Sequence, residues 1–477
     1  MNYRMICYVL SLVHAIEAGL MTLPLAVTLY YHEDPFAFLV AILVTLAAAG
    51  ILFAFRPKSR VLFAREGFVA VALSWVMMSL FGALPFTISG WIPSYVDAVF
   101  ETVSGFTTTG ASILVDIEAL PRGLLFWRSL THWIGGMGVL VFILAVLPLA
   151  SNNAMHIMRA EVPGPTVGKL VPRARKTARI LYVIYLAMTL LETVLLLLGG
   201  MPLYDALIHA FGTAGTGGFS NKALSVGAYE SAYIEWVIGV FMSLFSVNFT
   251  LYYLMLSGGL RDVLRDRELR LFGFVVVMTT GMITLNISRL YDGFWQSLRH
   301  AFFQVSSIVS TTGFATVNFD LWPEFSRWML VLLMFMGACA GSTGGGIKVG
   351  RMLILAKAAR CEVRRVLRPR SVNHVMVNGH IVDDETVRGS LTFFFLYIVL
   401  LLAGTMLVSF DGFDLATNFT GVLSCLSNIG PGLSLVGPMG GFWMFSDFSK
   451  IVLSAAMLIG RLEIFPVLVL FSPSLWK

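Results

Sequence analysis

Four turns of the chain bring together atoms that could bind a small cation. They are Thr108-Thr109-Gly110, Thr216-Gly217-Gly218, Thr311-Thr312-Gly313 and Asn428-Ile429-Gly430, each at the end of an apolar, helix-like run. Glycine permits left-handed backbone, so successive carbonyl oxygens can face one side of such a turn. A ring of carbonyls, helped by the hydroxyl or amide oxygens beside it, can replace the water around a dehydrated cation. No ring of acidic residues stands at the turns, so carbonyl dipoles rather than fixed charge would select the ion.

The elements that must position these turns are membrane helices, because the 477 residues are 57% hydrophobic and only 13% charged. Apolar runs of roughly 18 or more residues, typical of transmembrane helices, recur along the chain. Ten spans are predicted, near 7–30, 36–55, 68–90, 124–150, 178–200, 232–257, 270–288, 326–357, 389–410 and 449–473. Four further apolar segments are too short to cross: 95–109, 203–217, 296–312 and 415–429. We expect each of them to enter the membrane, reach one of the turns and leave on the same side.

The distribution of charge predicts the orientation of the spans. Most of the 33 Lys and Arg residues gather in the loops 56–65, 159–179, 261–270 and 357–388, whereas the alternate loops carry mainly Asp and Glu. Because basic loops face the cytoplasm, both termini are predicted inside and all four short segments enter from the outer face. Topology thus accounts for the net charge of +6, and nucleic-acid binding is not expected. The N-terminal apolar run is interpreted as a membrane helix rather than a signal peptide, since a second span follows at once.

Aligning the four glycines reveals an internal repeat. Six positions before them stand small residues, and two positions before them stand Thr or Asn. The first column is Ser104, Gly212, Ser307 and Ser424. The sequence therefore predicts an all-α polytopic membrane protein with four membrane–pore helix–membrane repeats around one pore, preceded by an N-terminal transmembrane helix pair. The predicted divisions are 1–60 for the pair and 61–155, 156–260, 261–370 and 371–477 for the repeats.

The predicted direction of the short helices also favours a cation. Their C-terminal ends, each with about half a negative charge, point toward the membrane centre. An alternative is that the glycines only allow membrane helices to cross closely. Their recurrence between two spans in every repeat, all on one face, favours the pore.

A second glycine-rich segment, from Gly337 to Lys348, interrupts the predicted span 326–357. So many glycines disfavour a continuous helix, since each costs about 1 kcal/mol relative to Ala. We expect an unwound loop below the third turn, which would gate the pore. The candidate gate residues are Gly341, Ser342, Thr343, Gly344, Gly345, Gly346 and Lys348. A phosphate-binding loop is disfavoured because GxxxxGK[ST] and a preceding strand are both missing, and a packing kink is the other alternative.

Arg461 lies in the last predicted span, where an ionised side chain is costly and is a functional candidate by default. There it could form a positive barrier below the turns that keeps a cation from being trapped. The alternative is a structural pair with Glu463 or with backbone carbonyls, although residues two apart do not face each other on a helix.

Several motifs together resemble the Trk/Ktr/HKT superfamily of potassium transporters, and most closely its bacterial Trk-type potassium uptake membrane subunit. They are Ser104-Gly105-Phe106-Thr107-Thr108-Thr109-Gly110, Trp127-Arg128-Ser129 followed by Trp133-Ile134-Gly135-Gly136-Met137-Gly138, Ser310-Thr311-Thr312-Gly313-Phe314, Ala340 to Lys348, and Gly460-Arg461-Leu462-Glu463-Ile464-Phe465. The similarity covers nearly the whole chain, including the N-terminal helix pair. The fourth turn departs from it, because it lacks Thr and has Pro431 after the glycine.

The resemblance implies a potassium-selective filter, an intramembrane gating loop over 338–348 and a pore Arg at 461. Its filter glycines would be Gly110, Gly218, Gly313 and Gly430. Gly rather than Ser at all four positions favours potassium over sodium. The resemblance also implies a homodimer in the inner (plasma) membrane of a bacterium, in contact with lipid and with a cytoplasmic ring of nucleotide-binding regulatory subunits. The basic segment 357–388 would suit that docking.

Selective potassium uptake, gated by the loop and a cytoplasmic partner, is the leading functional hypothesis. A membrane potential supplies about 2.3 kcal/mol per charge per 100 mV, so no ATP site and no cofactor are expected on this chain, with K⁺ as substrate. A proton- or sodium-coupled potassium symporter on the same scaffold is the alternative. An enzyme is not expected, because His132, His209 and His300 are scattered. The four cysteines also lack metal-ligand spacing.

Overall fold

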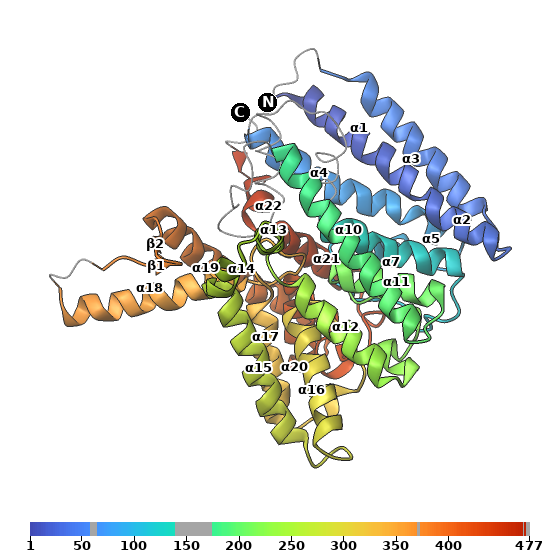
Figure 1. Cartoon of the computed structure of the whole chain (residues 1–477). Helices are drawn as coiled ribbons and strands as arrows, with labels where there is room; N and C mark the ends of the chain where they lie inside the picture. Colours follow the sequence, from blue (N-terminus) through green and yellow to red (C-terminus); the bar gives the residue numbers. More distant parts are fainter. Residues whose placement is uncertain (58–63, 139–173, 370–372, 471, 474–477) are drawn as a thin grey trace.

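The computed structural model describes residues 1–57, 64–138, 174–369, 373–470 and 472–473, which fold into a helical bundle (Figure 1). The predicted N-terminal helix pair comes first in the chain. Its first member consists of α1 (Tyr3–Leu20) and α2 (Thr22–Tyr30), which together are long enough to cross a membrane, and its second member is α3 (Phe36–Ala54). Helix α1 packs against α3 and against α4 of the first repeat, so the pair lies beside the repeats rather than within them.

The four repeats follow in order, each with a short helix between longer ones. Repeat one has α4 (Ala64–Gly82), α5 (Leu84–Ile88), α6 (Tyr95–Phe106) and α7 (Arg122–Gly136); repeat two has α10 (Ala174–Leu198), α11 (Leu203–Gly215), α12 (Ala232–Phe245) and α13 (Phe249–Leu256). After α14 (Leu260–Arg265), repeat three has α15 (Arg267–Ile287), α16 (Phe294–Val309), α17 (Glu324–Met336) and α18 (Val349–Leu367). Repeat four has α19 (Asp384–Val408), α20 (Leu415–Ser427), α21 (Asp447–Arg461) and α22 (Phe465–Leu470). Short 3₁₀ turns lie at Ser225–Tyr229, Phe319–Leu321, Ser409–Asp411 and Ser434–Val436.

The short helices α6, α11, α16 and α20 occupy the segments that the sequence predicts to be re-entrant, and we call them the pore helices. Side-chain caps fix where two of them begin. Ser94 accepts a hydrogen bond from the Asp97 amide of α6, and Asp414 accepts one from the Thr417 amide of α20. Such caps satisfy amides that have no partner within the helix. The divisions between repeats stay predictions, and the one at 155/156 lies outside the described residues.

Long apolar helices are fewer than the ten predicted spans. By length and composition, six stretches of the described residues could each cross a membrane, or seven if the bent pair α12 and α13 counts as one. The remaining predicted spans are interrupted or incomplete. The span 326–357 is interrupted by residues 337–348, which we call the glycine loop, and 124–150 runs partly outside the described residues. Unbroken spans at 232–257 and 449–473 were wrong predictions, because α12 meets α13 at 93° and α21 ends before Leu462.

Both breaks place polar groups against the glycine loop or its flank. At the first, Asn248 caps α13, and the Ser246 carbonyl accepts the Cys339 amide at 3.0 Å. At the second, Glu463 and Ile464 have left-handed backbone, and the Glu463 carboxylate pairs with Arg351 of α18. The partners lie about a hundred residues away in the chain, so a local apolar pattern could not predict either break.

Helix α18 extends away from the bundle beside a small hairpin (Figure 1). Strands β1 (Met376–Val377) and β2 (His380–Ile381) are antiparallel and are the strands found among the described residues. Their turn is Asn378-Gly379, and the Asn378 side chain bonds Asp266 and the Arg267 amide at the start of α15. The hairpin therefore ties the projecting region to the third repeat.

Large apolar side chains lie exposed on the outside of the bundle, including Leu43, Leu198 and Met406. Its interior holds a large apolar core, but buried Thr, Ser and Asn residues surround the four glycine turns. This inverted arrangement suits a protein surrounded by lipid, with its polar groups gathered at its centre.

Candidate functional site

The four glycine turns share one backbone conformation. The Thr or Asn two residues before each glycine is left-handed, with φ from 55° to 61°, and the glycines have φ from 78° to 102°. In every turn the amide just before the glycine donates to the carbonyl six positions before the glycine, at 2.8 to 3.0 Å. This bond closes the C-terminal end of each pore helix in the same way. The similarity of the repeats is therefore stronger in the backbone than in the sequence.

The turns form a closed ring in chain order. A Cβ added to Gly110 would come within 3.0 Å of the Gly217 carbonyl oxygen; Gly218 stands in the same relation to Thr312, and Gly313 to Ile429. The ring closes where Gly430 meets the Thr109 carbonyl, at 2.9 Å from the position of an added Cβ. Each filter-candidate glycine thus abuts the carbonyl just before the glycine of the next turn, which leaves no room for a side chain.

A cavity of about 190 Å³ lies directly on this ring. Gly110, Gly218, Gly313 and Gly430 all line it. Among its described lining residues, the charged ones are Arg128 and Lys222, and none is a carboxylate. The ring and its mouth therefore present backbone dipoles rather than negative side chains.

The side chains of the predicted turn residues are buried, and most are bonded to protein groups. The hydroxyls of Thr312 and Ser310 lie 2.7 Å apart, and Thr216 donates to the Gly215 carbonyl at 2.6 Å. Within the described part of the chain, Thr108 Oγ1 and Asn428 Oδ1 have no hydrogen-bond partner.

The fourth turn uses its Asn to close the ring. The side-chain amide of Asn428 donates through Nδ2 to Thr109 Oγ1 at 3.0 Å and to the Met457 carbonyl at 2.9 Å. Pro431 packs against Gly313, whose added Cβ would lie 2.8 Å from the proline ring. The departure of this turn from Thr thus provides a cross-link between the last and the first repeat.

The glycine loop, residues 337–348, lies against the third and fourth turns. The Gly345 amide donates to Thr311 Oγ1 at 2.7 Å. An added Cβ on Gly344 would lie 2.7 Å from the Ser310 carbonyl, and one on Gly345 would meet the Ser427 carbonyl. Only glycine fits at these two positions, so the loop touches the ring through its backbone.

Bonds to other elements and bonds within the loop hold it in place. The Glu268 carboxylate of α15 accepts the Ala340 and Gly350 amides at 2.7 and 2.8 Å. The Gly341 carbonyl accepts the Phe249 amide at 3.1 Å, and the buried Lys348 ammonium donates to the Gly344 carbonyl. The remaining predicted gate residues, Ser342 and Thr343, are buried and bond backbone carbonyls.

Arg461 connects the same loop to the first repeat. Its guanidinium donates to the Thr343 carbonyl at 2.7 Å and to the Gly136 carbonyl, at the end of α7, at 2.8 Å. Glu463, which the sequence left open as its partner, pairs with Arg351 instead. Backbone carbonyls, the other alternative, are what Arg461 binds.

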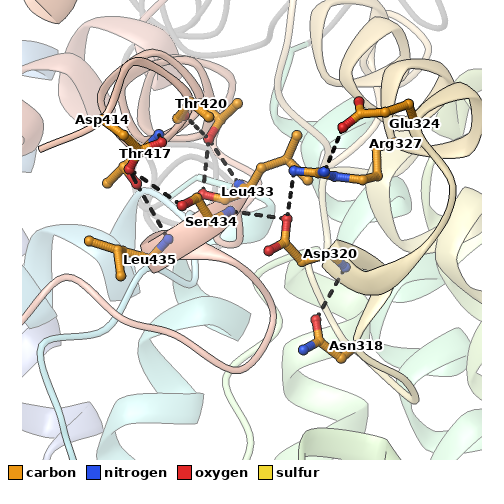
Figure 2. A network of polar contacts seen from close by, with 11 residues as sticks. Asn318, Asp320, Glu324, Arg327, Asp414, Thr417, Thr420, Leu433, Ser434 and Leu435 are labelled. Atoms are coloured by element: carbon orange, nitrogen blue, oxygen red, sulfur yellow. Dashed lines mark hydrogen bonds and ion pairs between the residues drawn. The ribbon is translucent and has the colours of Figure 1, made fainter.

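The chain beyond the ring carries a polar clasp between repeats three and four, shown in Figure 2. Asp320 accepts the Ser434 amide at 3.1 Å and pairs with Arg327 at 3.2 Å. Asp414 accepts the hydroxyls of Thr417 and Ser434, and the Thr417 hydroxyl holds the pKa of Asp414 below its ordinary value. The clasp fixes the segment that leaves the fourth turn to the segment that leaves the third.

Comparison with known proteins identifies the family. The family model described as "TrkH: Cation transport protein" matches residues 35–477. The chain is 37% identical to the Trk system potassium uptake protein TrkH of Salmonella typhimurium, over all of both chains. It is 36% identical to the Trk system potassium uptake protein TrkG of Escherichia coli, covering 95% of this chain and 94% of that protein. The crystal structure of the potassium transporter TrkH from Vibrio parahaemolyticus matches with a TM-score of 0.90 at 33% identity, over all of both chains.

This chain belongs to the TrkH family of cation transport proteins. The resemblance inferred from its motifs is confirmed, as is the predicted all-α membrane architecture. Membership of the TrkH family also places the chain among transport proteins rather than enzymes, as predicted.

Sequence reasoning missed two groups in this TrkH-family site. Glu268, which binds the glycine loop, stands among the basic residues of a predicted loop, and nothing in that pattern marks it. Asn248, whose amide lies against Gly341, falls in the middle of a predicted span. A polar residue inside an apolar run was the one available signal for Asn248.

Proposed function

We propose that this chain is the membrane pathway for selective potassium uptake in a bacterial inner membrane. The four glycine turns act as the selectivity filter and bind K⁺ through backbone carbonyls. The observation that carries this proposal is the closed ring, in which every glycine abuts the next turn's carbonyl. Potassium uptake is also what the names of the full-length relatives state of those proteins.

Electrostatics supports a cation at the ring. All four pore helices end there, and each helix C-terminus carries about half a negative charge. The mouth cavity adds no described carboxylate that would hold a divalent ion tightly. Carbonyl dipoles in a ring of fixed size favour a dehydrated monovalent cation.

The loop 337–348 acts as the gate, and Arg461 as a positive barrier beside it. The loop bonds Thr311 on one side and Arg461 on the other, so its position depends on both the ring and the first repeat. A positively charged barrier next to the filter would prevent a cation from being bound too tightly to leave.

A cytoplasmic nucleotide-binding subunit of the Trk type opens this gate, and the membrane chains pair as homodimers. Support for the partner comes from helix α18, which projects from the bundle (Figure 1) and on which Arg360, Arg364 and Arg365 are exposed. Helix α18 begins where the loop ends, so a partner bound to it could pull directly on the loop. Basic loops also face the cytoplasm, where both termini would then lie.

Ion flux into proteoliposomes tests this function and its alternative, a proton- or sodium-coupled symporter. The purified chain is reconstituted with a fixed negative interior potential, and potassium or sodium is supplied outside while a pH-sensitive dye reports protons. Potassium entry without proton or sodium movement is the expected result. Proton or sodium movement in fixed ratio to potassium would replace it with the symporter. Equal entry of sodium and potassium would contradict the filter.

A further inference from the structure

In three of the four repeats the pore helix carries a buried polar side chain nine positions before the glycine of its turn. The column consists of Glu101, His209, Gln304 and Gly421, all buried on their pore helices. It is unrelated to the Thr or Asn column that carries the turn itself. Its members differ in chemistry, which makes the four quarters of the ring unequal.

Each polar member of the column bonds the chain that leaves its own turn. Glu101 accepts the Ser112 hydroxyl and the Ile113 amide, both at 3.0 Å. His209 Nε2 lies 3.0 Å from the Ser220 hydroxyl, which occupies the same place after Gly218 as Ser112 does after Gly110. In the third repeat Gln304 donates to Thr316 at a longer 3.4 Å.

The fourth repeat replaces this bond with a neighbouring one. Gly421 has no side chain, and Thr420 accepts the Leu433 amide at 2.9 Å instead. Leu433 stands three residues after its glycine, as Ile113 does in the first repeat. In every repeat, therefore, a side chain of the pore helix bonds the segment that leaves the glycine turn.

The first repeat alone adds a charge pair to this tie. Arg128 of α7 donates to the Glu101 carboxylate, and the two residues are only 3% and 1% exposed. The same guanidinium donates to the Ser220 carbonyl at 3.0 Å and lies 3.5 Å from the centre of the Phe219 ring. Arg128 and Glu101 therefore link the segment that leaves turn one to the segment that leaves turn two.

We propose that Glu101 and Arg128 are positioning residues for ion selectivity, which brace turns one and two so that the carbonyl ring keeps its size. This inference rests on the proposed function, because it assumes that the ring selects the ion. A carboxylate that accepts several donors and a buried guanidinium fix their neighbours more strongly than neutral bonds do. Loss of the pair would let Gly110 and Gly218 move relative to the other two glycines.

A second ion pair on the same pore helix provides a matched control. Lys450 of α21 donates to Asp97, in the first turn of α6, far from the glycine. Both pairs anchor α6 to a longer helix. Of the two, the Glu101 pair contacts the segments that leave the turns, and the Asp97 pair does not. A merely structural effect on α6 would follow from breaking either one.

The test measures the potassium-to-sodium permeability ratio of Glu101→Gln, Glu101→Gln with Arg128→Gln, and Asp97→Asn in proteoliposomes. The ratio is expected to fall roughly tenfold in both Glu101 variants, since charged hydrogen bonds are lost. It should stay within about twofold of the parent in Asp97→Asn, because that bond lies away from the segments that leave the turns. The double variant matters because Glu101→Gln alone buries an unpaired charge, whereas removal of both charges is often tolerated.

Two results would overturn the inference: an unchanged ratio in the folded double variant, or an equal fall in Asp97→Asn. Gly110→Ser in the same assay separates this failure from that of the proposed function. If Gly110→Ser alters the ratio while the double variant does not, the filter stands and the brace is wrong. If neither alters it, the ring does not select the ion and both proposals fall.

Discussion

Glycines gather in two places at the centre of this chain, and the two places are held together differently. In the ring, one glycine per turn abuts the next carbonyl, and each turn is closed by a backbone bond to its own pore helix. The loop 337–348 holds five glycines, three of them consecutive, and its side-chain anchors on other elements are Glu268, Thr311 and Arg461.

The two kinds of contact indicate which region can move. The ring is built from backbone contacts between four separate turns, to which side chains such as Asn428 and Glu101 add further bonds. The loop is held by a few side-chain bonds and by backbone bonds to Ser246 and Phe249, each worth about 1 to 3 kcal/mol. A modest free energy could therefore rearrange it. A fixed ring beside an adjustable loop is the arrangement that a selective and regulated pathway needs.

The largest expected effect comes from breaking the ring. Gly110→Ser places a side chain against the Gly217 carbonyl at a φ of 80°, and should lower the potassium-to-sodium permeability ratio about tenfold or more. Gly90→Ser is the control, since Gly90 has a φ of 76° and no neighbour within 4 Å of an added Cβ. Equal effects of the two substitutions would mean that backbone strain, and not the ring, determines the result.

A smaller effect is expected where Arg461 holds the loop to α7. Arg461→Gln removes charge-assisted bonds to Thr343 and Gly136, and should raise potassium flux without a partner roughly tenfold. Arg461→Lys keeps the charge and should lie between the two. If Arg461→Gln conducts as the parent does, the residue is purely structural and the loop is held by other groups.

Weakening one anchor of the loop should give a milder change. Glu268→Gln keeps an oxygen acceptor but loses the charge, so the bonds to Ala340 and Gly350 weaken by about half. Hydrogen exchange of those two amides should speed up about three- to tenfold. Glu324→Gln removes an exposed carboxylate that pairs with Arg327 on α17, and should leave the loop amides unchanged. Unaltered exchange in Glu268→Gln would show that Glu268 does not restrain the loop.

The smallest effect concerns the clasp beyond the ring. Because the pKa of Asp414 is lowered in the folded chain from 3.8, its stabilisation is complete at neutral pH and is lost as the pH falls below that value. The melting temperature in detergent should therefore drop by roughly one degree more in the parent than in Asp414→Asn between about pH 6 and pH 3. Identical pH dependence of the two proteins would remove Asp414 from the clasp.

The sequence predicts the pore helices well, because each is a short apolar run that ends at a glycine turn. Helices α6 and α20 begin at the predicted residue, and α11 begins at its predicted start as well. The order of the turns in the ring could not be predicted, since it depends on contacts between residues about a hundred or more positions apart. The bend between α12 and α13 was missed for the same reason, because the groups that satisfy it belong to the glycine loop.

Functional side chains were predicted only where their type conflicts with their surroundings. Arg461 stands out as a charge in an apolar span, although its carbonyl partners could not be known. Glu268 sits in a charged segment and gave no such signal. Asn428 was recognised as a departure from Thr, but its cross-link to Thr109 spans 319 positions of sequence.

The bond between Asn428 and Thr109, which joins the last turn to the first, can form only after the fourth repeat has been synthesised. Three quarters of the ring can assemble while the ribosome is still making the final helices, but Gly430 reaches the Thr109 carbonyl only once the fourth repeat has been inserted. A chain arrested before that point has an open-sided ring that cannot enclose an ion. If the ring is the ion pathway proposed above, the growing protein completes that pathway only when its last repeat is in place.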